Sequence, residues 1–305
     1  MARGYEPGDS IDPREVAPDR EPLAGHSSDN EPRNRVHEER THETDPESHS
    51  DTTRPVDPRK AYEIRGRSYR LRNSEIATMV EVGKFRALSL EDLGEFAYGG
   101  DKVRMRPDVE NLFRQGLVQM KSIPHEEKGS RQLLALTKQG HRLLTANRIA
   151  DKDQAVYFGF AKPREAHHDA DLYRVYRKAA EKVERGGGRN LRVVLDYELK
   201  KRIYHDLAKL GPDRASDASK RDVAARHGLQ VVRAKIPLPD VRIEYDTREG
   251  ERVHIDLELA TGHYRGRNLA EKVRAGFSIY AHAGDVSNLR RVLDQRELTA
   301  EILSL

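Results

Sequence analysis

Apolar residues between positions 73 and 115 recur at intervals of three and four, which is the spacing of one helix face. Asn73 or Ser74 caps the first predicted helix, and Ser89 opens a short second one. A third helix is predicted from about Pro107 to Gln115. The positions expected on the inner faces of the first and third helices are Ile76, Met79, Val80, Phe85, Val109, Leu112 and Phe113.

The chain after Gly116 changes to a pattern typical of strands. We predict strands at 117–123 and 132–136, joined by a charged loop at 124–131. Thr137 is placed to cap one further helix. The predicted order is therefore three helices, a two-stranded hairpin and a final helix.

This order resembles a winged helix, and the wording of residues 111–118 and 134–140 is typical of that family. The resemblance implies a DNA-binding domain at 68–150, with the third helix in the major groove and the hairpin against phosphates. The side chains that it implies for DNA contact are Arg104, Arg106, Asn111 and Arg114 on the helix side, and Lys128 and Arg131 on the wing. A winged helix used for protein contacts, with these cations only solvated, is the alternative.

A second set of elements is predicted beyond residue 165. Apolar spacing indicates a helix at 165–184, glycines at 186–188 end it, and a short buried strand follows at 191–197. Charged helices are expected near 198–210 and 218–227. The predicted end of the sheet is a strand within residues 300–305.

Two alternating segments within this region form a predicted hairpin. The apolar positions that alternate are Val241, Ile243 and Tyr245, then Val253, Ile255, Leu257 and Leu259. If both sets face the same way, Tyr245 pairs with Val253 and a three-residue loop containing Gly250 closes the turn. Counting back places Asp240 opposite Glu258, about 5 Å apart, with Asp256 diagonal on the same face.

Three carboxylates on one sheet face repel one another unless a cation or protons lie between them. Mg²⁺ suits Asp240, Asp256 and Glu258 because it prefers oxygen ligands and keeps water in its shell, and Mn²⁺ is a second choice. The alternative is that Arg242, His254 and nearby cations neutralise the acids. The sequence leaves both interpretations open.

The acids also resemble a known motif. Pro239-Asp240, then Asp256-Leu-Glu258, then a helix with Lys272, is similar to the PD-(D/E)XK restriction-endonuclease-like superfamily. That resemblance implies a catalytic set of Asp240, Asp256, Glu258 and Lys272, with the metal on the three acids. The family's lysine position is occupied by Glu258, and Lys272 is the candidate for a lysine that has moved to the following helix. The alternative interpretation of Lys272 is a cation at the edge of an amphipathic helix.

Both regions together resemble the replication-relaxation family of plasmid and mobile-element proteins. The resemblance lies in a winged helix followed by a helix that begins at His-Asp, then Pro-Asp, the run 256–265, and residues 272–280. It implies an α+β multidomain chain, in which a restriction-endonuclease-like α/β domain at 165–305 follows the winged helix. His167 and His168 adjoin at a helix start, so a capping or surface role is predicted for them rather than zinc binding.

Charge divides the chain unevenly. Residues 1–60 hold 15 acidic and 9 basic side chains and one aromatic residue, which predicts a disordered acidic tail. The other residues hold 46 basic and 36 acidic side chains, a net charge of +10 that favours a polyanionic partner. The tail can bind a protein partner or shield the basic domain from nonspecific DNA. Oligomeric state leaves no signal in the sequence.

Composition also excludes some classes. The absence of cysteine excludes disulfides and thiolate zinc sites. No run approaches the roughly 18 apolar residues of a membrane span, and the N-terminus lacks the regions of a signal peptide, so we expect a cytoplasmic protein.

Two functions follow as expectations. The first is a DNA-binding protein of plasmid or mobile-element replication or mobilisation that cuts or nicks DNA with Mg²⁺. The second is a winged-helix regulator or accessory protein whose nuclease fold has degenerated.

Overall fold

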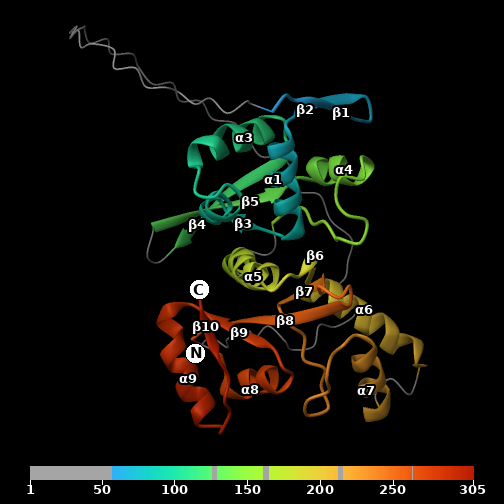
Figure 1. Cartoon of the computed structure of the whole chain (residues 1–305), viewed down its shortest axis with the longest axis vertical. Helices are drawn as coiled ribbons and strands as arrows, with labels where there is room; N and C mark the ends of the chain where they lie inside the picture. Colours follow the sequence, from blue (N-terminus) through green and yellow to red (C-terminus); the bar gives the residue numbers. More distant parts are fainter. Residues whose placement is uncertain (1–56, 126–128, 161–164, 212–215, 263) are drawn as a thin grey trace, which may run out of the picture. The chain divides into compact units, whose positions relative to one another are not determined.

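The structure is a computed structural model that describes residues 57–125, 129–160, 165–211, 216–262 and 264–305 (Figure 1). The predicted tail lies outside the described residues up to position 56. Residues 54–305 form one compact unit with a mixed α+β architecture. None of the helices in the described ranges is long and apolar enough to cross a membrane.

The first group of elements follows the predicted order. It comprises α1 (Asn73–Lys84), β3 (Leu88–Ser89), α2 (Leu90–Asp92), the π-helical turn η2 (Leu93–Ala97), α3 (Lys102–Arg114), β4 (Val118–His125), β5 (Gly129–Leu136) and α4 (Lys138–Ala146). The strands form an antiparallel sheet in the order β3-β5-β4, with Met120 paired to Leu134. Thr137 caps α4 as predicted, because its side chain accepts a hydrogen bond from the Gly140 N–H.

Helix α3 differs from its prediction in two respects, namely the residue at which it begins and the side chains that it buries. It begins at Lys102 because the Asp101 side chain caps it by accepting the Arg104 N–H, so Pro107 lies inside the helix. Phe113 was expected to be buried but is 49% exposed. The buried row of α3 is Met105, Asp108, Val109 and Leu112, and Phe113 lies about 100° around the helix from Leu112.

An additional hairpin precedes α1 and was not predicted. Strands β1 (Lys60–Ile64) and β2 (Arg67–Leu71) pair antiparallel, so Lys60 belongs to a strand and not to the tail. The two-residue turn between them, Arg65-Gly66, has φ values of 49° and 75°. Two positive φ values at the centre of a two-residue turn match the twist of paired strands, and glycine adopts the second without strain.

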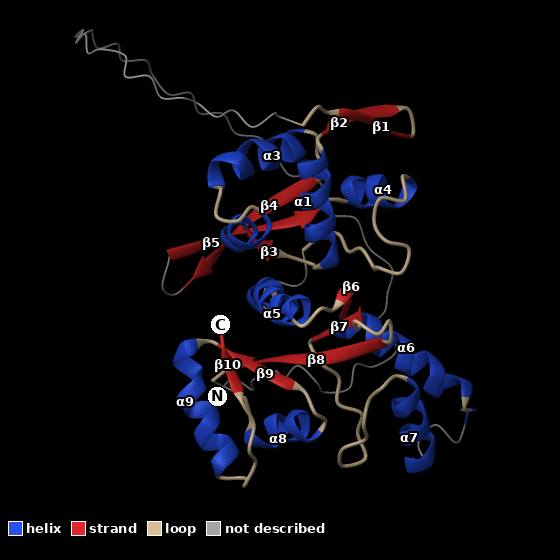
Figure 2. Cartoon of the chain, in the orientation of Figure 1, coloured by secondary structure: helices blue, strands red, loops and turns tan. Residues whose placement is uncertain are grey.

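The second group of elements surrounds a five-stranded mixed sheet (Figure 2). Its elements are α5 (Ala166–Arg185), β6 (Arg189–Leu195), α6 (Asp196–Lys209), α7 (Asp217–Arg226), β7 (Val241–Asp246), β8 (Arg252–Ala260), α8 (Gly266–Arg274), β9 (Ser278–Ala281), α9 (Ala283–Asp294) and β10 (Ile302–Ser304). The strand order is β10-β9-β8-β7-β6. Strands β6, β7 and β8 pair antiparallel, whereas β9 and β10 continue in parallel from β8.

The register predicted for β7 and β8 is confirmed. Tyr245 pairs with Val253, and Gly250 in the turn has a φ of 86°. The apolar set of this hairpin, which includes Ile243 and Leu257, packs with α5. The opposite face of the sheet packs with the helices α6 to α9 in a second apolar cluster (Figure 2). Polar residues of β8 must therefore lie on the face turned toward this second layer.

Candidate functional site

Asp240 lies immediately before β7, at the end of the sheet where β8 carries Leu259. Its Oδ2 accepts a hydrogen bond of 2.9 Å from the Leu259 N–H. Its Oδ1 lies 3.5 Å from Nε2 of His168 in α5. The carboxylate of Asp240 is therefore bound from the sheet on one side and by a histidine from the covering helix on the other.

Glu258 and Lys272 meet beside Asp240. Glu258 is 1% exposed, and its Oε1 lies 2.7 Å from Nζ of Lys272 in α8. The Tyr264 hydroxyl donates to the same oxygen, and Lys272 also donates to the Leu238 carbonyl at 2.6 Å. Oε2 of Glu258 is buried and has no hydrogen-bond partner among the described residues. The structure thus brings together three of the four predicted catalytic residues.

Proton affinities in this cluster follow from burial and charge. Burial and the neighbouring charge of Asp240 raise the pKa of Glu258 to about 7, against the effect of Lys272. Burial opposes the ionisation of Asp240 too, but His168 and Lys272 outweigh it and lower the pKa of Asp240. Burial lowers the pKa of His168, but Asp240 outweighs it and raises that pKa to about 9. The cluster therefore holds Asp240, which is ionised near neutral pH, and Glu258, which is partly protonated there.

Asp256, the fourth predicted residue, is bound elsewhere on the same strand face. Nε and Nη2 of Arg242 donate to Oδ1 and Oδ2 of Asp256 at 2.6 and 2.8 Å. Arg242 is 4% exposed and also donates to the His227 carbonyl. His254 Nε2 lies 3.8 Å from Oδ2. Both oxygens of Asp256 are therefore occupied, and the acid is neutralised by Arg242, with His254 beside it, as in the alternative interpretation.

This arrangement does not fit the expected Mg²⁺ or Mn²⁺ site. Asp240, Asp256 and Glu258 are each paired with a protein cation, and Oε2 of Glu258 is the one oxygen of these three carboxylates without a hydrogen-bond partner among the described residues, whereas a hard divalent ion needs several carboxylate oxygens. Within the described ranges, no group of three or more acidic, His or Cys side chains has the arrangement to hold a metal ion.

Sequence reasoning missed the contributions of α5 and α6. A capping or surface role was expected for His168; its side chain is 37% exposed, and its Nε2 lies 3.5 Å from Oδ1 of Asp240. Burial raises the pKa of the adjacent Asp169 to about 6, against the charges of Arg86 and His168. The backbone N–H of Asp196, at the start of α6, donates to the Asp240 carbonyl at 3.2 Å. The sequence signal that indicates His168 and Asp169 is the His-Asp pair at the start of α5.

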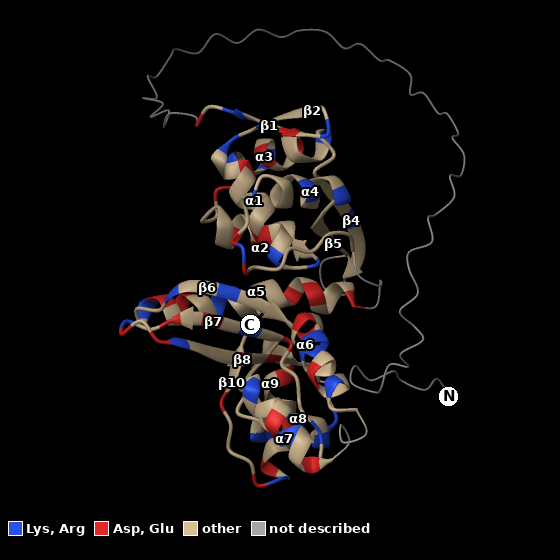
Figure 3. Cartoon of the chain, turned by 90° about the vertical axis from the view of Figure 1, so that its right-hand side faces the viewer, with Lys and Arg blue, Asp and Glu red and all other residues tan. Residues whose placement is uncertain are grey.

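The residues implied for DNA contact divide into exposed and occupied ones. Arg104, Arg106 and Arg114 are exposed on α3, where Figure 3 shows basic residues on α3 and on the β1–β2 hairpin. The side-chain amide of Asn111 instead donates to Oε1 of the buried Glu75 at 2.9 Å. Lys128 lies outside the described residues. Asn111 is therefore used within the protein, where it links α3 to α1.

Arg131 lies on the β4–β5 hairpin, as expected of a wing residue, but its side chain is buried against acidic residues of the protein. It is 8% exposed and donates to Asp92 at 2.9 Å and to Asp171 of α5 at 2.7 Å. Asp92 is fully buried and also accepts from Arg174 at 2.6 Å. Arg131 lies at the third pair from the turn end of the β4–β5 hairpin, opposite Ile123, where it is within reach of these acids. Its guanidinium holds β5 to α5 and is not available to a phosphate in this structure.

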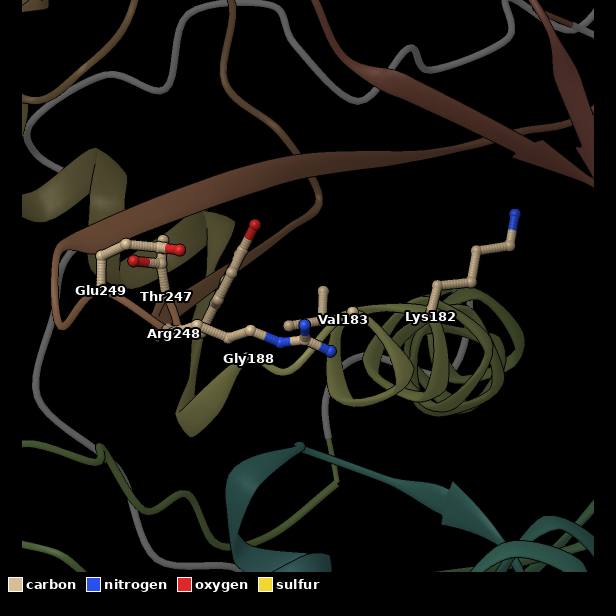
Figure 4. Close-up of a pocket in the computed structure, with 8 residues that line it drawn as sticks. Lys182, Val183, Gly188, Thr247, Arg248 and Glu249 are labelled. Atoms are coloured by element: carbon tan, nitrogen blue, oxygen red, sulfur yellow. The ribbon is translucent and has the colours of Figure 1, made fainter.

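A cavity of about 540 Å³ lies between the end of α5 and the β7–β8 turn (Figure 4). The Arg248 side chain extends toward Val183, and Lys182 points away from it. Arg248 approaches Gly187 so closely that a Cβ there would lie 2.1 Å from its Nε. None of the residues predicted to form a site lines this cavity.

Comparisons with known proteins return little. No family model and no curated protein sequence matches the chain. One similar solved structure is "Crystal structure of Bacillus subtilis PadR in complex with operator DNA", with 13% identity, a TM-score of 0.21, and coverage of 50% of this chain and 90% of that chain. That TM-score identifies neither a fold nor a family for this chain, so its function must be argued from its own residues.

Proposed function

We propose that this protein binds duplex DNA through a winged helix at residues 68–150, with α3 as the element that enters the major groove. The observation that carries this proposal is the exposed side of α3, where Arg104, Arg106 and Arg114 project from one helix. Guanidinium groups on a helix suit both phosphates and the acceptor edge of guanine. The net charge of +10 outside the first 60 residues supports the same partner.

The helical layers and mixed sheet beyond residue 165 support a restriction-endonuclease-like domain as the second part of this proposal. The order from α5 to β9 is a helix, a strand, two helices, two strands, a helix and a strand, in which β6, β7 and β8 pair antiparallel and β9 pairs parallel to β8. The resemblance of residues 256–265 and 272–280 to the replication-relaxation family favours a role in plasmid or mobile-element DNA transactions.

In this proposal the second domain does not cut DNA. Arg242 occupies both oxygens of Asp256, and Lys272 is paired with Glu258. The protein is then a DNA-binding regulator or accessory protein in which protein cations hold the acids that resemble metal ligands.

Two measurements on the full chain test the two parts of the proposal. Duplex affinity measured against salt concentration is expected to fall steeply as salt rises, because each neutralised phosphate releases counterions. Absence of a salt-dependent affinity would overturn DNA binding. Supercoiled and linear duplex incubated with Mg²⁺ or Mn²⁺ are expected to stay intact. Cleavage that is lost in Asp240→Ala would overturn the non-catalytic assignment and leave DNA binding standing.

A further inference from the structure

The β1–β2 hairpin presents four exposed cations. Lys60, Arg65, Arg67 and Arg70 are exposed along the two strands and their turn, against a single acid in the hairpin, Glu63. Tyr69 and Leu71 are buried, so the hairpin is anchored to the protein by its apolar residues. The cations are therefore carried on a fixed element.

Polar contacts fix the hairpin to α3 in particular. Gln115, at the end of α3, accepts from the Arg70 N–H and donates to the Arg70 carbonyl, both at 3.2 Å. Arg72 binds the buried Asp108 of α3 at 3.2 Å. These contacts hold the hairpin at one position beside the helix whose exposed face carries the proposed DNA contacts. Ordering of the hairpin is thus already complete before any ligand binds.

A polar groove of about 570 Å³ runs between the hairpin and α3. Its lining residues are Asp57, Pro58, Arg59, Ser68, Arg70, Arg72, Asn111 and Gln115. The groove is thus lined by three arginines and by one carboxylate, that of Asp57, which already accepts a hydrogen bond of 2.9 Å from the Asn73 N–H. Arg59 and Arg72 are paired with buried Glu75 and Asp108, which leaves Arg70 as the exposed guanidinium of the groove. The groove is suited to a phosphate because the exposed guanidinium of Arg70 lies in it beside two further arginines.

We propose that this hairpin and groove form a second DNA-contacting element, which binds the sugar-phosphate backbone beside the groove that α3 enters. The inference rests on the proposed function, because α3 sets where the duplex lies. Contacts to phosphates carry no base information, so the hairpin contributes affinity and register rather than sequence preference. Arg65 at the tip and Arg70 in the groove are the two side chains that make these contacts.

The test is the double variant Arg65→Asn/Arg70→Gln in the full chain. Asparagine tolerates the positive φ of 49° at position 65, so the turn is preserved, and the Arg70 backbone keeps its bonds to Gln115. A thermal midpoint at or above that of the unaltered protein verifies that the hairpin is intact. The duplex affinity is expected to fall for all sequences alike, and the plot of log affinity against log salt is expected to become less steep by about 2.

Arg233→Asn/Lys235→Gln is the matched control, because it also removes two exposed positive charges. Arg233 is exposed, has a φ of 50°, and lies in a two-residue turn closed by Val232 and Lys235, far along the chain from the hairpin. The double substitution is expected to leave the salt slope unchanged. An unchanged slope in the hairpin variant, with steep binding by the unaltered protein, would overturn this inference alone. No salt-dependent binding by the unaltered protein would instead overturn the proposed function.

Discussion

The guanidinium of Arg242 holds both carboxylate oxygens of Asp256, at 2.6 and 2.8 Å, across the β7–β8 pair. The two residues are direct partners in the register, and their side chains are 5% and 8% exposed. This pairing occupies the acid that resembles a nuclease metal ligand. The charge of Asp256 is thus satisfied by the protein itself.

Removing one member of this pair is expected to destabilise the protein strongly. Asp256→Asn leaves the guanidinium of Arg242 buried without its counter-charge, which costs about 3–5 kcal/mol of unfolding free energy. Arg242→Met/Asp256→Leu removes both charges and is expected to recover most of that loss. Urea unfolding of the single and double variants measures both. A single variant as stable as the unaltered protein would contradict the pairing.

The stability of the protein is expected to fall with rising pH because of Glu258. Burial and Asp240 raise the pKa of Glu258 from 4.5 to about 7, so between these values the folded state holds a proton that the unfolded state has lost. The stability that this group contributes is complete below pH 4.5 and is lost as pH rises through about 7. Glu258→Gln removes this loss, so its stability changes less over that window. Urea midpoints measured across the window test this, and parallel profiles for the two proteins would rule it out.

Arg131 is expected to affect stability and not DNA affinity. Arg131→Met leaves the fully buried Asp92 with one guanidinium fewer, which lowers the unfolding free energy by about 3 kcal/mol. The salt slope of duplex binding by the folded variant stays that of the unaltered protein. Arg114→Met, on the exposed face of α3, is the matched variant and is expected to do the reverse. A reduced slope with full stability in Arg131→Met would contradict this assignment.

Asn111 is likewise expected to support the fold rather than read a base. Asn111→Ala removes a 2.9 Å hydrogen bond to the ionisable and buried Glu75, at a cost of about 1.5–3 kcal/mol. Competition among duplexes that differ by single base pairs is expected to give the same sequence preference as the unaltered protein. Relaxed preference at one base pair, with unchanged stability, would assign Asn111 to base reading after all.

Local pattern was enough to predict much of the fold. Alternation of apolar residues fixed the pairing of Tyr245 with Val253, and this pairing places Asp240 near Glu258. Alternation cannot say which acid receives a cation, because that depends on side-chain reach across strands. Arg242 was recognised as a neutralising candidate, and the structure shows it bound to Asp256.

Other features depended on contacts between distant segments. The place of Arg131 in the sequence indicates a wing residue. Its side chain, however, binds Asp171, which lies 40 residues further along the chain. The Asn111 side chain donates a hydrogen bond to Glu75, which lies 36 residues away in the sequence. The β1–β2 hairpin was missed because its strands are only five residues long and carry several charges, and most of it lies between the predicted tail and the first predicted helix.

Binding of duplex DNA by the exposed face of α3 is tested by the salt dependence of affinity in Arg106→Gln/Arg114→Gln. Both side chains are exposed, so the fold is expected to be unaffected. The exposed pair Arg233→Gln/Lys235→Gln is the control with equal charge loss. We predict a slope less steep by about 2 in the α3 variant alone. Equal slopes in the α3 variant, the control and the unaltered protein would contradict the account.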